Sequence, residues 1–222
     1  MAPIERRPFL DYLLSWLQTQ GVREVILCVG YKRSHIQRFV GRGSKWGMRV
    51  KYSVERELLG TAGALKRAGR LIFAKTMLVM NGDTFLDVSL RELMEFHQRR
   101  KAFVTLATAR VADSSRYGSL CLDRRNRITA FLEKSRKDQY FRSEKENCQI
   151  NGGIYVFDRK LLRKIRNNGR VSLEKEVFPS LLTKKNVYAF TSDAYFLDIG
   201  IPEELRRAQR ELPQRICVSH PR

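Results

Sequence analysis

The chain has 222 residues, of which 43% are hydrophobic and 30% are charged, so it can bury the core of one globular domain. Its 43 Lys and Arg outnumber its 23 Asp and Glu, and the formal net charge of +20 favours anionic partners such as nucleotides, sugar phosphates or nucleic acid. No apolar run approaches the length of a membrane span and the first residues do not resemble a signal peptide, so we expect a cytoplasmic protein without a membrane segment.

The first half of the chain predicts alternating helices and strands. The expected order is a helix over 8–20, a buried strand over 24–29, a helix over 34–40, a strand over 49–55, a helix entered through 58–65, a buried strand over 76–80 and a capped helix over 89–99. This order is typical of a doubly wound parallel sheet, although such a sheet normally begins with a strand and this chain begins with a helix.

The second half predicts mostly strands. They are expected over 103–110, 117–122, 127–133, 149–157, 186–191 and 195–198, with helices over 159–166, 173–182 and 203–212. Strands without intervening helices pair antiparallel, so the sheet should be mixed. We therefore predict an α/β protein, Rossmann-like with three layers α/β/α and a mixed, mainly parallel sheet, in a single domain over 1–222.

The cysteines and histidines do not predict a metal site. Cys28 and Cys121 lie in expected strands and are predicted to be small core residues in a reducing compartment. The spacing of all four cysteines is unlike that of zinc ligands, and the three histidines are isolated from one another.

Two aspartates lie at the ends of apolar strands with a glycine within two residues. Asp83 ends the sequence Asn-Gly-Asp after the strand over 76–80, and Asp198 ends the strand over 195–198. Open α/β sheets bind ligands at the carboxyl ends of their strands, and carboxylates suit Mg²⁺. The two side chains could share one Mg²⁺ in a phosphoryl-transfer site, although either aspartate could instead serve only to form a turn.

Two further segments suit a nucleotide or sugar phosphate. The segment Gly60-Thr61-Ala62-Gly63 has no bulky side chain, so its backbone could lie against a base or a phosphate, or it could be a plain helix start. Glu133 and Lys134 follow a strand. The lysine could bind a phosphate and the glutamate could accept from sugar hydroxyls, or the pair could be a solvated strand end.

Together these segments resemble the sugar-1-phosphate nucleotidylyltransferases of the NTP-transferase superfamily, and most of all the heptose- or mannose-1-phosphate guanylyltransferase type. The matching segments occur in family order over nearly the whole chain: Pro8-Phe9-Leu10-Asp11-Tyr12-Leu13, Leu59-Gly60-Thr61-Ala62-Gly63-Ala64, Asn81-Gly82-Asp83, Tyr117-Gly118, Phe131-Leu132-Glu133-Lys134, Asn151-Gly152-Gly153-Ile154-Tyr155-Val156-Phe157 and Asp198-Ile199-Gly200-Ile201-Pro202-Glu203. The resemblance implies the nucleotide-diphospho-sugar transferase type of fold. It also implies transfer of a nucleoside monophosphate from an NTP to a sugar 1-phosphate, with release of pyrophosphate.

The resemblance assigns roles to particular residues of this chain. Asp83 and Asp198 would hold Mg²⁺, Lys134 would bind the sugar phosphate, and Glu133 would bind sugar hydroxyls. Gly118 and Gly153 would line the sugar pocket, Gly60 would pack near the base, and Thr61 and Asn151 would also bind substrate. Glu55 would read the base edge and favour GTP, because a carboxylate only accepts and guanine offers N1–H and N2–H₂ donors.

The sequence departs from the family pattern at two places. Ile201 stands where the family usually has Thr, a change expected to affect only the final turn. The family also opens with a strand and a Gly-rich phosphate loop, and this sequence begins beyond them, so the first strand is expected to be missing. We predict weak pyrophosphate release from GTP and a sugar 1-phosphate by these 222 residues, and brisk turnover would refute that prediction.

Two other functions stay open. A non-catalytic relative that binds or regulates would explain the missing loop, whereas the presence of Asp83, Lys134 and Asp198 argues against it. A nucleic-acid-binding protein is supported by charge alone and would show binding that weakens steeply with salt. A homo-oligomer is left open.

Overall fold

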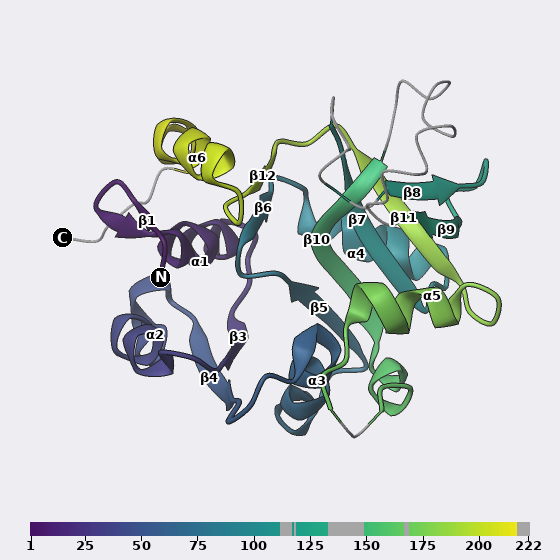
Figure 1. Ribbon diagram of the computed structural model, residues 1–222, viewed down its shortest axis with the longest axis horizontal. Helices are drawn as coiled ribbons and strands as arrows, with labels where there is room; N and C mark the ends of the chain where they lie inside the picture. The colour runs from purple at the N-terminus through teal and green to yellow at the C-terminus, as the bar shows by residue number, and fades with distance from the viewer. Residues whose placement is uncertain (112–116, 118, 133–148, 167–168, 217–222) are drawn as a thin grey trace. The chain divides into compact units, whose positions relative to one another are not determined.

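The computed structural model describes residues 1–111, 117, 119–132, 149–166 and 169–216. Contacts divide the chain into two compact units (Figure 1). The first unit comprises Met1–Ala74, Leu162–Leu173 and Leu197–Arg222, and the second comprises Lys75–Leu161 and Glu174–Phe196. Whether the units act together as the single domain expected from the sequence stays a prediction.

The first unit is built on two parallel strands and four helices. β3 (Glu24–Val29) pairs in register with β4 (Arg49–Val54). The helices are α1 (Phe9–Thr19), α2 (Arg33–Val40), α3 (Gly60–Ala68) and α6 (Pro202–Arg215), and short 3₁₀ turns cover Ser44–Trp46 and Gly69–Leu71. A small hairpin of β1 (Pro3–Ile4) and β2 (Arg7–Pro8), which the sequence analysis did not predict, precedes α1.

The second unit is organised around β10 (Gln149–Asp158). One edge of β10 pairs antiparallel with β7 (Val104–Arg110), and its other edge pairs antiparallel with β5 (Thr76–Met80) and β8 (Ser119–Leu122). β11 (Val187–Ser192) runs parallel to β7, and β9 (Ile128–Leu132) pairs antiparallel with β8. The second unit also contains β6 (Thr84–Leu86), and β12 (Phe196–Asp198) begins in it and ends in the first unit.

The two faces of the β10 sheet are covered by different helices. On one face, Phe96 of α4 (Leu90–Arg99) packs edge-on against Tyr188 and Phe190. On the other face, Phe178 of α5 (Phe178–Leu181) packs on Tyr155 and Phe157 (Figure 1). The α/β class, the helical layers and the mixed sheet are therefore confirmed. The pairs made by β10 and the pair of β8 with β9 are antiparallel, whereas β3 with β4 and β7 with β11 are parallel.

Several local predictions needed correction. The strands β3 and β5 were expected to be buried, yet only Val29 in β3 and Met77 in β5 are buried. Cys28 and Cys121 were expected in the core, but Cys28 is exposed and Cys121 is half-buried. The physical reason is common to both strands, since among the described residues each pairs along one edge alone, β3 with β4 and β5 with β10.

The helix expected over 173–182 is divided. A π-helical turn over Leu173–Val177 leads into the single turn of α5. The helix expected over 159–166 is a 3₁₀ helix over Arg159–Arg163. The predicted cap of α4 is confirmed, because the Ser89 hydroxyl accepts from the Glu92 amide at 3.2 Å. No helix in the described part of the chain is long and apolar enough to cross a bilayer.

Candidate active site

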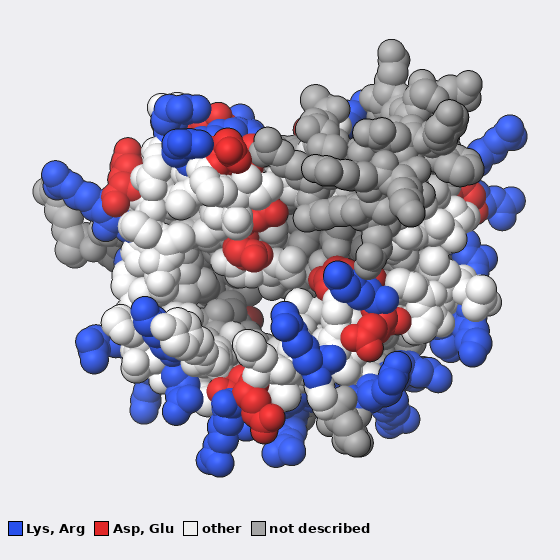
Figure 2. Space-filling view, viewed as in Figure 1, with Lys and Arg blue, Asp and Glu red and all other residues white. Residues whose placement is uncertain are grey.

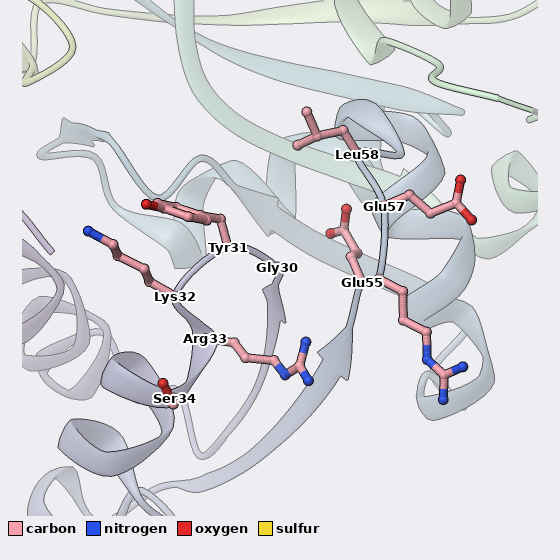
Figure 3. A pocket seen from close by; sticks show the side chains of 9 residues that line it. Gly30, Tyr31, Lys32, Arg33, Ser34, Glu55, Glu57 and Leu58 are labelled. Carbon is pink, nitrogen blue, oxygen red and sulfur yellow. The ribbon is translucent and has the colours of Figure 1, made fainter.

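A pocket of about 470 Å³ opens in the first unit where the parallel strands β3 and β4 end (Figure 3). Two short segments, residues 30–34 and 55–58, form its wall. The carboxyl ends of parallel strands carry ligand sites in α/β proteins, because the loops that leave them diverge and open a crevice. The size is within the usual range for a small-molecule site.

Glu55 supplies a hydrogen-bond acceptor in this pocket. Its backbone amide donates to the Val29 carbonyl at 2.8 Å, which continues the strand pairing by one residue. A Cβ placed on Gly30 would lie 3.7 Å from the Cβ of Glu55, so the two strand ends touch. Figure 3 shows the Glu55 carboxylate pointing toward the segment of Gly30 and Tyr31. The structure thus places the predicted Glu55 at a binding pocket.

The opposite wall supplies cations and an aromatic surface. Lys32 and Arg33 line the pocket at the start of α2, and the Lys32 ammonium lies 5.2 Å from the centre of the Tyr31 ring. Tyr31 is 84% exposed. A ring with an open face can stack on a planar base, and the two cations suit an anion. The sequence analysis missed these residues, although Gly30 after an apolar strand is the same signal that drew attention to Asp83.

Gly60 and Thr61 lie outside this pocket wall and contact the chain around Val171. Gly60 has a φ of +72°, and a Cβ there would clash with the Val171 carbonyl oxygen and lie 2.9 Å from its carbon. The Val171 carbonyl accepts from the Ala62 amide at 3.0 Å, and the Thr61 hydroxyl accepts from the Leu173 amide at 2.8 Å. Close backbone packing explains the small residues, and contact with a base stays a prediction.

Asp83 lies in an exposed turn between β5 and β6 of the second unit. The Asn81 amide donates to the Gly153 carbonyl at 2.8 Å, which fastens the start of the turn to β10. The Thr84 hydroxyl is buried at the other end of the turn. The structure therefore places Asp83 directly after a strand, as expected, on a turn held by β10.

Asn151 and Gly153 lie beneath that turn. The pairing of β10 with β7 shifts register between Asn151 and Ile154, which marks a β-bulge. Gly153 has a φ of +76°, and a Cβ there would clash with the Thr84 hydroxyl and lie 3.3 Å from the Asn81 side-chain nitrogen. The structure thus brings these two predicted residues together with the turn of Asp83.

Asp198 lies in the first unit at the end of β12. Its Oδ1 accepts from the Gly200 amide at 2.9 Å, so the carboxylate shapes its own turn. Asp83 and Asp198 belong to different units, and their meeting around one ion stays a prediction. Glu133, Lys134 and Gly118 lie outside the described residues.

The donor chemistry of the two aspartates fits Mg²⁺. No cluster of three or more His, Cys, Asp and Glu able to hold a metal occurs among the residues described. Mg²⁺ commonly takes only one or two protein carboxylates and completes its shell with water and substrate phosphates. Asp83 is exposed to solvent and Asp198 is half-buried, so an ion and its water ligands can reach both carboxylates.

The positive charge is dispersed over the visible face. Figure 2 shows Lys and Arg in small groups with Asp and Glu among them. A duplex-binding protein would instead gather its cations into one stripe or patch. This face therefore offers no support for a dedicated nucleic-acid surface.

Known proteins resemble the chain over most of its length. The nucleotidyl transferase family model matches residues 1–215. A D-glycero-alpha-D-manno-heptose 1-phosphate guanylyltransferase from Aneurinibacillus thermoaerophilus is 38% identical over 97% of this chain and 90% of that protein. A mannose-1-phosphate guanylyltransferase from Mycobacterium tuberculosis is 34% identical over 99% of this chain and 60% of that protein.

A solved structure shares the fold. The crystal structure of HddC from Yersinia pseudotuberculosis complexed with GMP-PN has a TM-score of 0.83 and is 31% identical, covering 95% of this chain and 88% of that one.

Proposed function

The chain belongs to the nucleotidyl transferase family, and from this membership we propose that it transfers GMP from GTP to a sugar 1-phosphate, giving a GDP-sugar and pyrophosphate. The observation that carries the proposal is the Glu55 carboxylate in a pocket at the ends of two parallel strands. The guanylyltransferase names of the relatives support the choice of nucleotide.

The pocket would bind the guanine base. Glu55 can accept from both N1–H and N2–H₂, whereas uracil, thymine and adenine each present an acceptor where guanine presents one of these donors. Tyr31 would offer its ring to the face of the base, and Lys32 and Arg33 would add positive charge beside the nucleotide. This division of roles separates base selection in the first unit from the chemistry assigned to Asp83 in the second.

The proposed reaction is an in-line displacement at the α-phosphorus of GTP. An oxygen of the sugar 1-phosphate forms the new bond to phosphorus, and the bond from phosphorus to the oxygen of the pyrophosphate breaks, so no proton has to be removed from the nucleophile. Asp83 and Asp198 would hold Mg²⁺, which when bound neutralises phosphate charge and aligns the reactants. Lys134 would bind the sugar phosphate and Glu133 the sugar hydroxyls.

The heptose substrate is proposed before mannose. This chain is 38% identical to the Aneurinibacillus heptose 1-phosphate enzyme and 36% identical to a similar enzyme from Campylobacter jejuni, against 34% for the mycobacterial mannose-1-phosphate enzyme. We expect D-glycero-alpha-D-manno-heptose 1-phosphate to be used with a higher kcat/KM than mannose 1-phosphate, as measured by pyrophosphate release at fixed GTP.

Replacing Glu55 with Gln tests the base assignment. The amide keeps one acceptor and replaces the other with a donor that faces a guanine donor. Loss of one charge-assisted hydrogen bond is worth about 1.5–3 kcal/mol, so kcat/KM for GTP should fall about 10- to 150-fold. Turnover with ATP should fall much less.

The control for this test is Glu24→Gln. Glu24 begins β3 at the end of the sheet away from the pocket and pairs with Lys51 at 2.8 Å. The control should keep the preference of the original chain for GTP. An unchanged ratio of GTP to ATP turnover in Glu55→Gln would contradict the assignment, whatever the absolute rate of the chain.

A further inference from the structure

A buried tyrosine hydroxyl lies beneath the turn that carries Asp83. The side chain of Tyr155 on β10 has no exposed surface. Its ring stacks on Phe157 at 5.6 Å between centres and packs on Phe178 at 5.2 Å. Apolar packing of this kind requires only a phenylalanine, so the hydroxyl must be explained by its hydrogen bonds, since a buried hydroxyl without partners is costly.

This hydroxyl both donates and accepts a hydrogen bond. It donates to Oε1 of Glu174 at 3.1 Å, and it accepts from Nδ2 of Asn151 at 2.8 Å. Oδ1 of the same Asn151 side chain accepts from the Gly153 amide at 3.0 Å. The hydroxyl thus joins two side chains from separate parts of the second unit, and Asn151 extends the network to the backbone of Gly153.

Two irregular backbone segments converge on this atom. Asn151 begins the β-bulge of β10, and Glu174 belongs to the π-helical turn Leu173–Val177. Bulges re-aim side chains and are frequent beside active sites, and π-helical turns are frequent at functional sites. Both irregular segments thus supply a side chain to the same hydrogen-bond network.

The network reaches Asp83 through Asn81. Asn151, which donates to Tyr155, also accepts from the Gly153 amide, and the Gly153 carbonyl accepts from the Asn81 amide at 2.8 Å. The chain of hydrogen bonds that starts at Tyr155 therefore ends on the backbone of Asn81, two residues before Asp83. We propose that Tyr155, held by Glu174, is a positioning residue that fixes the turn 81–84 and so aims the Asp83 carboxylate for the transfer reaction. The part that concerns catalysis rests on the proposed function.

The first test replaces Tyr155 with Phe, which keeps the ring and removes the hydroxyl. Hydrogen exchange measured by mass spectrometry should speed up at least tenfold in the peptide that covers residues 81–84. At the same time kcat should fall at least tenfold while the KM for GTP stays within twofold, because the base pocket is unaffected. The matched control is Tyr188→Phe, in the same unit, whose ring packs on Phe96 of α4. The control should change neither quantity.

The second test varies Glu174. Glu174→Leu removes the acceptor and should match Tyr155→Phe in both exchange and kcat, and the double variant should lose little more. Glu174→Gln keeps an acceptor oxygen and should recover most of the loss. Additive losses in the double variant, or a fall in kcat without faster exchange at 81–84, would assign Glu174 a direct role on substrate and overturn the proposal.

Two results separate this proposal from the proposed function. If exchange rises equally throughout the second unit in Tyr155→Phe, the tyrosine is a general stabilising residue and the positioning role is wrong. If the unaltered chain transfers no GMP from GTP, the proposed function fails. The exchange measurement still decides in that case whether the network holds the turn.

Discussion

Replacing Gly60 with Ala tests whether the small residues at the start of α3 are required by packing within the chain. A left-handed φ of +72° costs an alanine about 1–2 kcal/mol. The new Cβ would also clash with the carbonyl of Val171, a backbone group that cannot rotate away. To relieve this clash, the start of α3 must move away from Val171. That movement weakens the hydrogen bonds from Ala62 to Val171 and from Val171 to Leu59.

The expected loss can be estimated from these contacts. Two backbone hydrogen bonds are worth about 0.5–1.5 kcal/mol each, so the total loss in unfolding free energy is about 2–5 kcal/mol. Gly21→Ala is the matched control, because Gly21 has a φ of +79° and a Cβ there would meet nothing within 4 Å. The control should lose only about 1–2 kcal/mol of unfolding free energy, the cost of an alanine in the left-handed backbone conformation.

Urea unfolding measures the difference between these variants. Both tryptophans of the chain, Trp16 and Trp46, are buried in the first unit, so their fluorescence reports on the unit that contains Gly60. Equal losses in the two variants would refute the packing argument. Weaker GTP binding by Gly60→Ala without any loss of stability would refute it as well and would favour the contact with the base.

Three further predictions concern stability. Asp11 is 1% exposed, and its carboxylate accepts from Lys45 at 2.9 Å and from Trp46 at 3.1 Å. Asp11→Leu should therefore lower the unfolding free energy measured in urea by about 2–4 kcal/mol, which is less than the loss for a fully buried ion pair because Lys45 is partly exposed. A loss near zero would contradict this prediction. Burial lowers the pKa of His97, although the charge of Asp158 opposes this shift. As the pH drops below about 6.5 the unfolded chain therefore takes up the proton first, and the unfolding free energy should fall. His97→Gln should make the unfolding free energy less dependent on pH in this range. Burial, and to a smaller extent the charge of Glu174, raise the pKa of Tyr155 well above its ordinary value of 10.0. The unfolded tyrosine therefore loses its proton first, and the unfolding free energy should fall above pH 10. In Tyr155→Phe this fall should be less steep than in the original chain.

Local patterns in the sequence were sufficient to predict most of the helices and strands. The apolar spacing of residues 8–20 and the alternation over 49–55 predicted α1 and β4 to within about one residue at each end, because both signals depend on neighbours along the chain. The same kind of signal placed Asp83 after a strand and Glu55 at the end of another. The order of short motifs was sufficient to indicate the family, because each motif is local.

Contacts between distant residues were decided by the tertiary structure. The sequence did not reveal that β10 would pair antiparallel along both edges, that β3 would leave Cys28 exposed, or that Gly60 would meet the Val171 backbone. The hydroxyl of Tyr155 could not be distinguished from an ordinary core tyrosine until its partners were known. Periodicity records which face of an element is apolar, but not which segment will pack on that face or which donor will meet which acceptor, since those depend on how the whole chain folds.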